Sequence, residues 1–441
     1  MSRAAIPGPR KGVRTAVALP AIAAASVLLL AACGGGGSSG NSAQGTSTPQ
    51  STTTPQGTTT PQAPAPASTP DPQDKNTEQQ KNQTPEPDGA RVTVNPANKA
   101  TGIEPGKAIT VTAADGVLTR VRISDTDGET VRGSLSADGL TWTSSGKTVP
   151  GTVYTVSVDS RSAKGKGGSS TSTFTTAKAD RINKLAMKPA DGGTFGVAQP
   201  VSITFDYPVV DKAEVERHLN VTASVPTEGS WGWIKDISGK DRADWRPKEY
   251  WKAGTKVTLN ADLTGVKSGK GTYFARDYAS TFTVGTGRVV EVDVPNHKVK
   301  VIENGETVKT LAMSAGSDEF PTRGGTHVIL GKNATETLDS QTVGLGDSYK
   351  LPDVPWVVHF TSSGTFFHSA AWNTANIGVN NTSHGCVGMT VEDAKWFYER
   401  VQVGDPVVVK GSNSTATTDS GNGFGAWQLS YAQWQAKSAL K

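Results

Sequence analysis

Most of the chain after residue 88 consists of short runs in which apolar and polar residues alternate. Neighbouring side chains of a strand point to opposite faces, so each run predicts a strand with one buried side. Asp-Gly pairs at 115–116, 127–128 and 138–139 predict tight turns between the runs. An Ig-like β-sandwich is therefore expected over residues 89–178. Its predicted strands are Ile109–Thr112, Leu118–Ile123, Leu140–Trp142, Tyr154–Val158 and Ser172–Thr176.

Residues 179–286 repeat this plan, since Val201–Thr204 matches Ile109–Thr112 and Ser280–Thr283 matches Ser172–Thr175. The weak repeat predicts a second Ig-like module. Four of its tryptophans admit two interpretations: a binding surface for glycan or protein, or packing in the core of the module or in its contact with the next domain. We favour packing, because tryptophan contributes buried area first. These residues are Trp231, Trp233, Trp245 and Trp251.

Residues 287–411 also read as β-rich, with a predicted hairpin around Pro295-Asn296-His297 and one predicted helix. Thr390 is its expected N-cap, and Asp393 would complete a capping box. Residues 412–441 form a tail containing Trp427 and Trp434, which we expect to dock on the preceding domain. The predicted apolar stripe of the helix is Val391, Ala394, Phe397 and Val401.

The first 33 residues have the organisation of an export signal, with a basic start, an apolar stretch at 16–32, and Cys33 followed by four glycines. The stretch resembles the lipobox of bacterial lipoproteins, which implies that Cys33 carries lipid and holds the protein on the extracytoplasmic face of the cell membrane. An ordinary signal peptide is the alternative. Residues 34–88 lack large apolar side chains and predict a disordered linker.

The net charge of the chain bears on which partners can be expected. The net charge of +4 falls to zero without residues 1–33, which hold four basic and no acidic residues. A neutral chain gives no electrostatic reason to expect nucleic acid as a partner.

Candidate chemistry surrounds the second cysteine, in Ser383-His384-Gly385-Cys386. If Cys33 carries lipid, Cys386 is the only thiol of an exported chain and has no partner for a disulfide. A nucleophilic thiol needs to ionise and needs an imidazole to take its proton, and His368 lies upstream. Gly385 permits unusual backbone angles, so the neighbouring N–H groups have the freedom to converge on an oxyanion.

His368, the following fourteen residues and the Ser-His-Gly-Cys string together resemble the signature of L,D-transpeptidases of the YkuD type. The wider organisation over 89–441 is similar to multidomain L,D-transpeptidases of actinobacteria, with 287–411 as the catalytic domain. The resemblance implies that Cys386 is the acylated nucleophile and His368 the proton donor and acceptor. It also implies roles for Ser369, whose carbonyl would orient His368, and for the oxyanion-hole residues His384, Gly385 and Cys386.

The same resemblance implies the partners. A tetrapeptide stem of peptidoglycan would acylate Cys386 and release D-Ala, and the side-chain amine of a diamino acid in a second stem would form a 3→3 cross-link. Ser383 and Tyr349 are further candidate substrate contacts, and residues 331–355 lie where relatives have a loop over the cleft. No metal or cofactor is expected, and carbapenem β-lactams are expected covalent inhibitors. Gly388 departs from the Arg or Asn that many relatives carry.

Other functions would use the same residues. The chain could be an L,D-carboxypeptidase or another cysteine acyl hydrolase of the cell wall, or a non-catalytic wall-binding lipoprotein. A sortase or papain-like peptidase would need a differently placed histidine. A zinc hydrolase would recruit His359, His368, His384 and Cys386, although the sequence has no HExxH or CxxC spacing.

Overall fold

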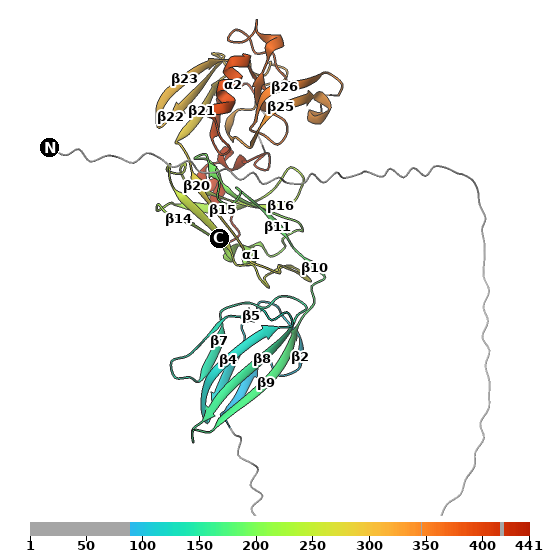
Figure 1. Cartoon of the computed structure of the whole chain (residues 1–441). Helices are drawn as coiled ribbons and strands as arrows, with labels where there is room; N and C mark the ends of the chain where they lie inside the picture. Colours follow the sequence, from blue (N-terminus) through green and yellow to red (C-terminus); the bar gives the residue numbers. More distant parts are fainter. Residues whose placement is uncertain (1–88, 345, 415–418) are drawn as a thin grey trace, which may run out of the picture. The chain divides into compact units, whose positions relative to one another are not determined.

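The computed structural model describes residues 89–344, 346–414 and 419–441 of the 441-residue chain. The export signal with Cys33 and the linker at 34–88 lie outside these described residues. The described part is mostly β, as predicted, with three α-helices, α1 to α3 (Figure 1). Among the described residues, no helix is long and apolar enough to cross a membrane.

The first folded region consists of two sheets that face one core. One sheet has the order β1-β3-β7-β6, and the other has the order β2-β9-β8-β4-β5. Fully buried Ile123, Val156 and Phe174 lie between them, as expected for a sandwich built from alternating runs. The bounds are β1 Arg91–Asn95, β2 Ala100–Ile103, β3 Thr110–Ala114, β4 Gly116–Asp125, β5 Thr130–Val131, β6 Gly133–Leu135, β7 Thr141–Ser144, β8 Val153–Ser162 and β9 Gly167–Thr176.

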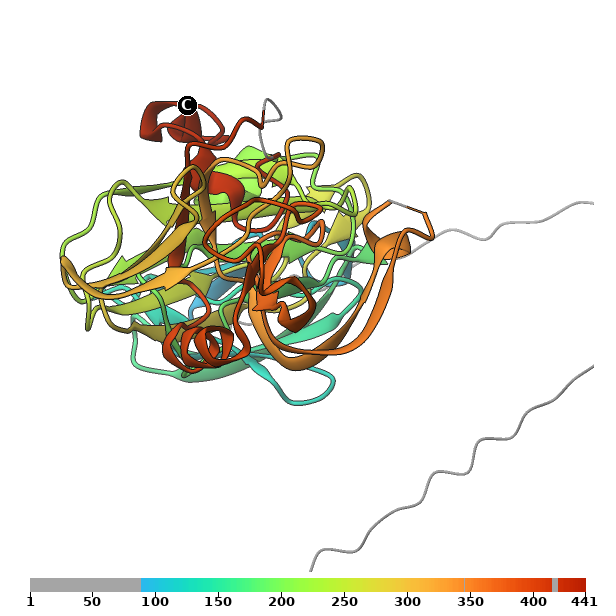
Figure 2. The same ribbon diagram turned by 90° about the horizontal axis from the view of Figure 1, so that it is seen from above.

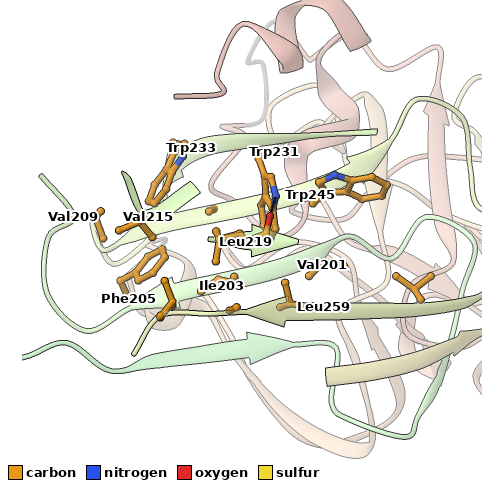
Figure 3. Close-up of a cluster of buried hydrophobic side chains, with 14 of the residues drawn as sticks. Val201, Ile203, Phe205, Val209, Val215, Leu219, Trp231, Trp233, Trp245 and Leu259 are labelled. Carbon is orange, nitrogen blue, oxygen red and sulfur yellow. Dashed lines mark hydrogen bonds between the residues drawn. The ribbon is translucent and has the colours of Figure 1, made fainter. Parts of the chain in front are cut away.

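The second region has its own, larger core. Its sheets have the orders β11-β13-β16-β15, β12-β20-β17-β14 and β10-β19-β18. Trp231, Trp233 and Trp245 lie within this core, as does Trp251, and all four are at most 8% exposed (Figure 3). Their interpretation as core residues is confirmed. The bounds are β10 Arg181–Ile182, β11 Leu185–Lys188, β12 Thr194–Phe195, β13 Val201–Phe205, α1 Lys212–Arg217, β14 Leu219–Ala223, β15 Gly229–Lys235, β16 Asp241–Pro247, β17 Lys256–Ala261, β18 Lys267–Gly269, β19 Thr272–Tyr273 and β20 Tyr278–Val284.

The third region contains the Cys386 segment and two sheets, with the orders β23-β22-β21-β29-β24 and β25-β26-β27-β28. The predicted hairpin at Asn296 joins β21 to β22. Buried Phe360, Phe367 and Phe397 connect the second sheet to helix α2. The bounds are β21 Arg288–Asp293, β22 Lys298–Glu303, β23 Glu306–Ala312, β24 Gly325–Val328, β25 Gly331–Asp339, η1 Ser340–Val343, β26 Lys350–His359, β27 Phe366–Ser369, η2 Ala371–Asn373, β28 Val387–Met389, α2 Val391–Arg400, β29 Pro406–Lys410, η3 Gly425–Gln428 and α3 Tyr431–Gln435.

Helix α2 begins where the sequence predicted, with the Thr390 hydroxyl accepting a hydrogen bond from the Asp393 N–H. Two details differ. The Asp393 carboxylate pairs with Lys309 at 3.1 Å instead of completing a capping box. Val391 is 45% exposed, so the buried stripe of the helix begins at Ala394.

The described residues of the 331–355 segment belong to a long β-hairpin. Strands β25 and β26 pair in antiparallel register, and the short helix η1 lies near the turn. The hairpin projects from its sheet and is drawn in orange in Figure 2. A paired backbone satisfies its own hydrogen bonds, so this segment can extend away from the core without becoming irregular.

The tail packs on the third region, as expected, and on the second region as well. Gln428 donates to the Thr326 carbonyl, 2.7 Å away, in the third region. Trp434, however, is fully buried in the second Ig-like region, where its Nε1–H donates to the Ser230 carbonyl at 3.0 Å. The indole packs against Gly232, where a Cβ would lie 2.6 Å from the nearest ring atoms. Only a glycine leaves room for this ring. The sequence of the tail gives no indication that Trp434 packs on Gly232.

Candidate active site

Two parallel strands bring the candidate nucleophile and base together. In the pairing of β27 with β28, His368 lies opposite Gly388, and Cys386 immediately precedes β28. Both Cys386 and His368 line one cavity of about 380 Å³. The strand register thus explains why residues that are distant in sequence share a cavity.

The imidazole of His368 is held in a defined orientation. Its Nδ1 lies 2.7 Å from the Ser369 carbonyl oxygen, the contact that the resemblance implied. A carbonyl only accepts hydrogen bonds, so Nδ1 carries the proton and Nε2 is left as a proton acceptor. The ring stacks on Trp372 with centroids 5.6 Å apart, and burial lowers the pKa of His368 below its ordinary value. The residue is therefore a neutral base near pH 7.

Cys386 is half-buried, and its thiol points toward the Gly364 carbonyl at an Sγ···O distance of 3.6 Å. Burial raises the pKa of this thiol to about 12, because an enclosed site disfavours the thiolate. A thiolate at rest, expected from the cysteine–histidine pair, is therefore not the favoured form. A neutral thiol beside a neutral imidazole can still react if the proton moves during the attack.

The loop before Cys386 is stabilised by its own serine. The Ser383 hydroxyl donates to the Cys386 carbonyl at 2.6 Å and accepts from the Gly385 N–H at 3.1 Å. Gly385 has a φ of +114°, a region that a glycine adopts without steric cost. Of the three N–H groups implied for the oxyanion hole, that of Gly385 is thus occupied. Those of His384 and Cys386 have no partner among the described residues.

Aromatic rings surround His384, which precedes Cys386 by two residues. The His384 ring lies 5.2 Å from the ring of Tyr349, which belongs to the hairpin segment, and 4.8 Å from that of Phe320. Burial raises the pKa of Tyr349. Tyr349, His384 and Cys386 line not only the first cavity but also a second one of about 540 Å³.

The two cavities differ in chemistry. The first carries no Asp, Glu, Lys or Arg among its described lining residues, which include the apolar Leu338, Leu351 and Trp372. The second carries the charged residues Asp318, Glu319 and Arg323. Cys386 therefore borders an apolar cavity and a charged one.

Gly388 occupies a position where a side chain has little room. A Cβ there would lie 2.9 Å from the Ala370 Cβ and 3.8 Å from Cε1 of His368. The first distance is shorter than real Cβ atoms show, so the Asn or Arg of many relatives requires a shift of β27 or β28.

The sequence analysis missed Trp372, Phe320 and Thr322. Trp372 follows His368 by four residues, the one signal that pointed to it. Phe320 and Thr322 come from a distant loop without a recognisable motif, and Thr322 donates to the Gly385 carbonyl at 2.8 Å.

The four zinc-ligand candidates do not form one cluster. His359 pairs with Glu336 at 2.7 Å. Within the part of the chain that the structure describes, no group of three His, Cys, Asp or Glu side chains is placed to hold a metal ion.

Comparisons with known proteins identify the family. A model described as the L,D-transpeptidase catalytic domain matches residues 287–409, and a bacterial Ig domain model matches residues 100–267. L,D-transpeptidase 2 of Mycobacterium tuberculosis is 33% identical over 356 residues, 79% of this chain and 85% of that protein. L,D-transpeptidase 5 of the same species is 32% identical, over 80% of this chain and 78% of that protein.

A solved structure of an L,D-transpeptidase in complex with imipenem is 32% identical to this chain. The match covers 52% of this chain and 99% of the chain in that structure, with a TM-score of 0.45. The extent and identity of the match to L,D-transpeptidase 2, together with the family model that matches the third region, show that this chain belongs to the L,D-transpeptidase family.

Proposed function

We propose that this L,D-transpeptidase cross-links peptidoglycan stems by acyl transfer through a thioester on Cys386. The observation that supports this role best is the geometry of His368. Its Nδ1–H is held by the Ser369 carbonyl at 2.7 Å, and its ring shares a cavity with the thiol. An imidazole fixed in this way presents Nε2 as base and then as acid.

The first half of the reaction forms the acyl-enzyme. The Cys386 thiol passes its proton to Nε2 of His368 as sulfur attacks the carbonyl carbon of the third stem residue, a diamino acid. The carbonyl oxygen becomes an oxyanion, which the N–H groups of His384 and Cys386 stabilise. The C–N bond then breaks, His368 returns the proton to the departing amine of D-Ala, and a thioester remains.

The second half transfers the acyl group. The side-chain amine of a second stem attacks the thioester and gives a proton to His368, and the C–S bond breaks. The new amide is the 3→3 cross-link, and the proton restores the Cys386 thiol. Water attacking in place of the amine would give the carboxypeptidase reaction, and Tyr349 of the hairpin segment lines both cavities beside Cys386.

Product analysis tests this assignment. The purified chain is incubated with disaccharide-tetrapeptide, and the masses of the products are measured. We expect a cross-linked dimer and free D-Ala from the wild type, and neither from Cys386→Ser, because a serine hydroxyl ionises far less readily than a thiol. His359→Gln, outside both cavities, is the matched control. Dimer formation by Cys386→Ser at the wild-type rate would refute the nucleophile.

β-Lactams of the carbapenem class should acylate the same thiol, since their strained carbonyl meets the same nucleophile and the same N–H groups. A stoichiometric mass increase on the wild type and none on Cys386→Ser is the expected result. A wild type that gains no mass would contradict the proposed mechanism.

For localisation, we propose that lipid on Cys33 anchors the mature chain to the extracytoplasmic face of the cell membrane. The support is the run of small residues, the cysteine and the following glycines at the end of the apolar stretch, and diacyl anchors give stable attachment. Cell fractionation should find Cys33→Ala released from membranes with its chemistry intact. A variant that stays entirely membrane-bound would contradict the proposal.

A further inference from the structure

We infer that Thr322 is a positioning residue that aims the backbone N–H of Cys386 at the oxyanion, an inference that rests on the proposed function. Thr322 is 1% exposed and lies in a loop outside the Ser-His-Gly-Cys motif. Its hydroxyl accepts a hydrogen bond from the Gly316 N–H at 2.9 Å and donates one to the Gly385 carbonyl at 2.8 Å. A hydroxyl has one proton to donate, so these two contacts fix its orientation.

The contact controls the direction of the next N–H group. The peptide bond between Gly385 and Cys386 is trans, since the two cis bonds of the described residues precede Pro96 and Pro189. In a trans peptide the C=O and the following N–H point in opposite directions. By holding the Gly385 carbonyl, Thr322 keeps the Cys386 N–H pointing away from itself, and this N–H has no partner among the described residues.

Such an anchor is needed because the peptide is next to a glycine. Gly385 has a φ of +114°, and a glycine reaches alternative backbone conformations at little cost. Within the described ranges, the Ser383 hydroxyl alone holds its N–H, which belongs to the preceding peptide group. Without the Thr322 hydroxyl, the Gly385–Cys386 peptide would lose the contact that determines its rotation.

Thr322 is itself held tightly against the nucleophile loop. Gly316 pairs with Ser383 in an isolated parallel bridge. A Cβ on Gly316 would lie 2.5 Å from the Thr322 nitrogen and 2.9 Å from the Gly385 Cα. The Ser412 hydroxyl, from the start of the tail, donates to the Thr322 carbonyl. Backbone and side chain of Thr322 are thus both restrained, as a positioning residue requires.

This role predicts a separation between two reactions of the same thiol. Acylation by a carbapenem generates an oxyanion and needs the Cys386 N–H, whereas alkylation by iodoacetamide displaces iodide at a saturated carbon and generates none. Loss of an oxyanion donor lowers acyl-transfer rates by about 10²–10³-fold. A misdirected donor should therefore lower acylation by roughly tenfold or more and leave alkylation nearly unchanged.

The test measures both second-order rate constants on the full chain by intact mass. Thr322→Val keeps the shape and removes the hydroxyl, and Thr322→Ser keeps the hydroxyl. Thr255→Val is the matched control, because Thr255 is fully buried and its hydroxyl donates to Lys252 at 2.7 Å in the second Ig-like region. Thr322→Ala replaces the valine variant if that variant does not fold.

We expect Thr322→Val to lose at least tenfold in acylation and less than twofold in alkylation, with Thr322→Ser and Thr255→Val close to the wild type. Unchanged acylation by Thr322→Val would overturn the inference and leave the proposed function intact. Equal losses in both reactions would also overturn it, because they would indicate general disruption of the loop. A wild type that is alkylated but never acylated would refute the proposed function and, with it, this role.

Discussion

Replacing His368 by glutamine should make the reactivity of Cys386 depend on pH over the whole alkaline range. In the wild type, burial lowers the pKa of His368 below 6.5, so its neutral, basic form already predominates at pH 7. Acylation should then be nearly level from pH 7 to pH 9 and should fall only as more acid protonates the imidazole. Without the imidazole, reaction depends on thiolate that forms unaided.

The magnitude follows from the thiol. With a pKa of about 12, Cys386 at pH 7.5 is ionised in only about one molecule in 30,000, against about one in ten for an ordinary cysteine. Loss of a general base commonly costs about 10²–10⁴-fold. We therefore expect His368→Gln to acylate at least about 100-fold more slowly at pH 7.5. Its rate should rise about tenfold per pH unit up to pH 10 without levelling.

The assay measures carbapenem acylation by intact mass between pH 5.5 and 10, with iodoacetamide as a second probe that reports the thiolate alone. His218→Gln is the matched control, since His218 lies in the second region and contacts Glu214. It should keep the wild-type profile.

Two results would refute this reasoning. A plateau of the His368→Gln rate near pH 9 would mean that the thiol has an ordinary pKa and is not affected by burial. An acylation rate equal to that of the wild type at pH 7.5 would remove His368 from its role as base.

Three further predictions concern packing and burial. Trp434→Ala should destabilise the docked tail by about 3–5 kcal/mol and expose residues 419–441 to proteolysis; unchanged protease resistance would contradict this. Burial raises the pKa of Asp405 to about 6 although Arg288 lies 2.8 Å away. The folded state therefore holds this proton more tightly than the unfolded state, and stability should fall by up to about 3 kcal/mol as pH rises from 4 to 6. Urea unfolding should show this fall in the wild type relative to Asp405→Asn, and a pH-independent difference would count against it. Gly388→Ala should cost about 1–3 kcal/mol in the same assay, because its Cβ would meet Ala370; full wild-type stability would show that the strands separate freely.

The local sequence pattern was sufficient to predict the fold class, helix α2 and the family of this protein. Runs of alternating apolar and polar residues predicted a mostly β chain, because successive side chains of a strand point to opposite faces of the sheet. The Thr390 cap located helix α2 for the same reason, since capping involves residues three apart. The spacing of His368 and Cys386 indicated the family, because the thiol and its base are required in a set order along two adjacent strands.

Other properties depended on contacts between distant segments. The pKa of Cys386 is set by the enclosure of the site, which no local pattern records. The Thr322 hydroxyl reaches Gly385 only because Gly316 lets two loops approach closely. Trp434 packs in the second region, and not in the third, because Gly232 leaves room there for its ring. In each case the property depends on a residue that is far away in the sequence. Only the tertiary structure brings the two residues into contact.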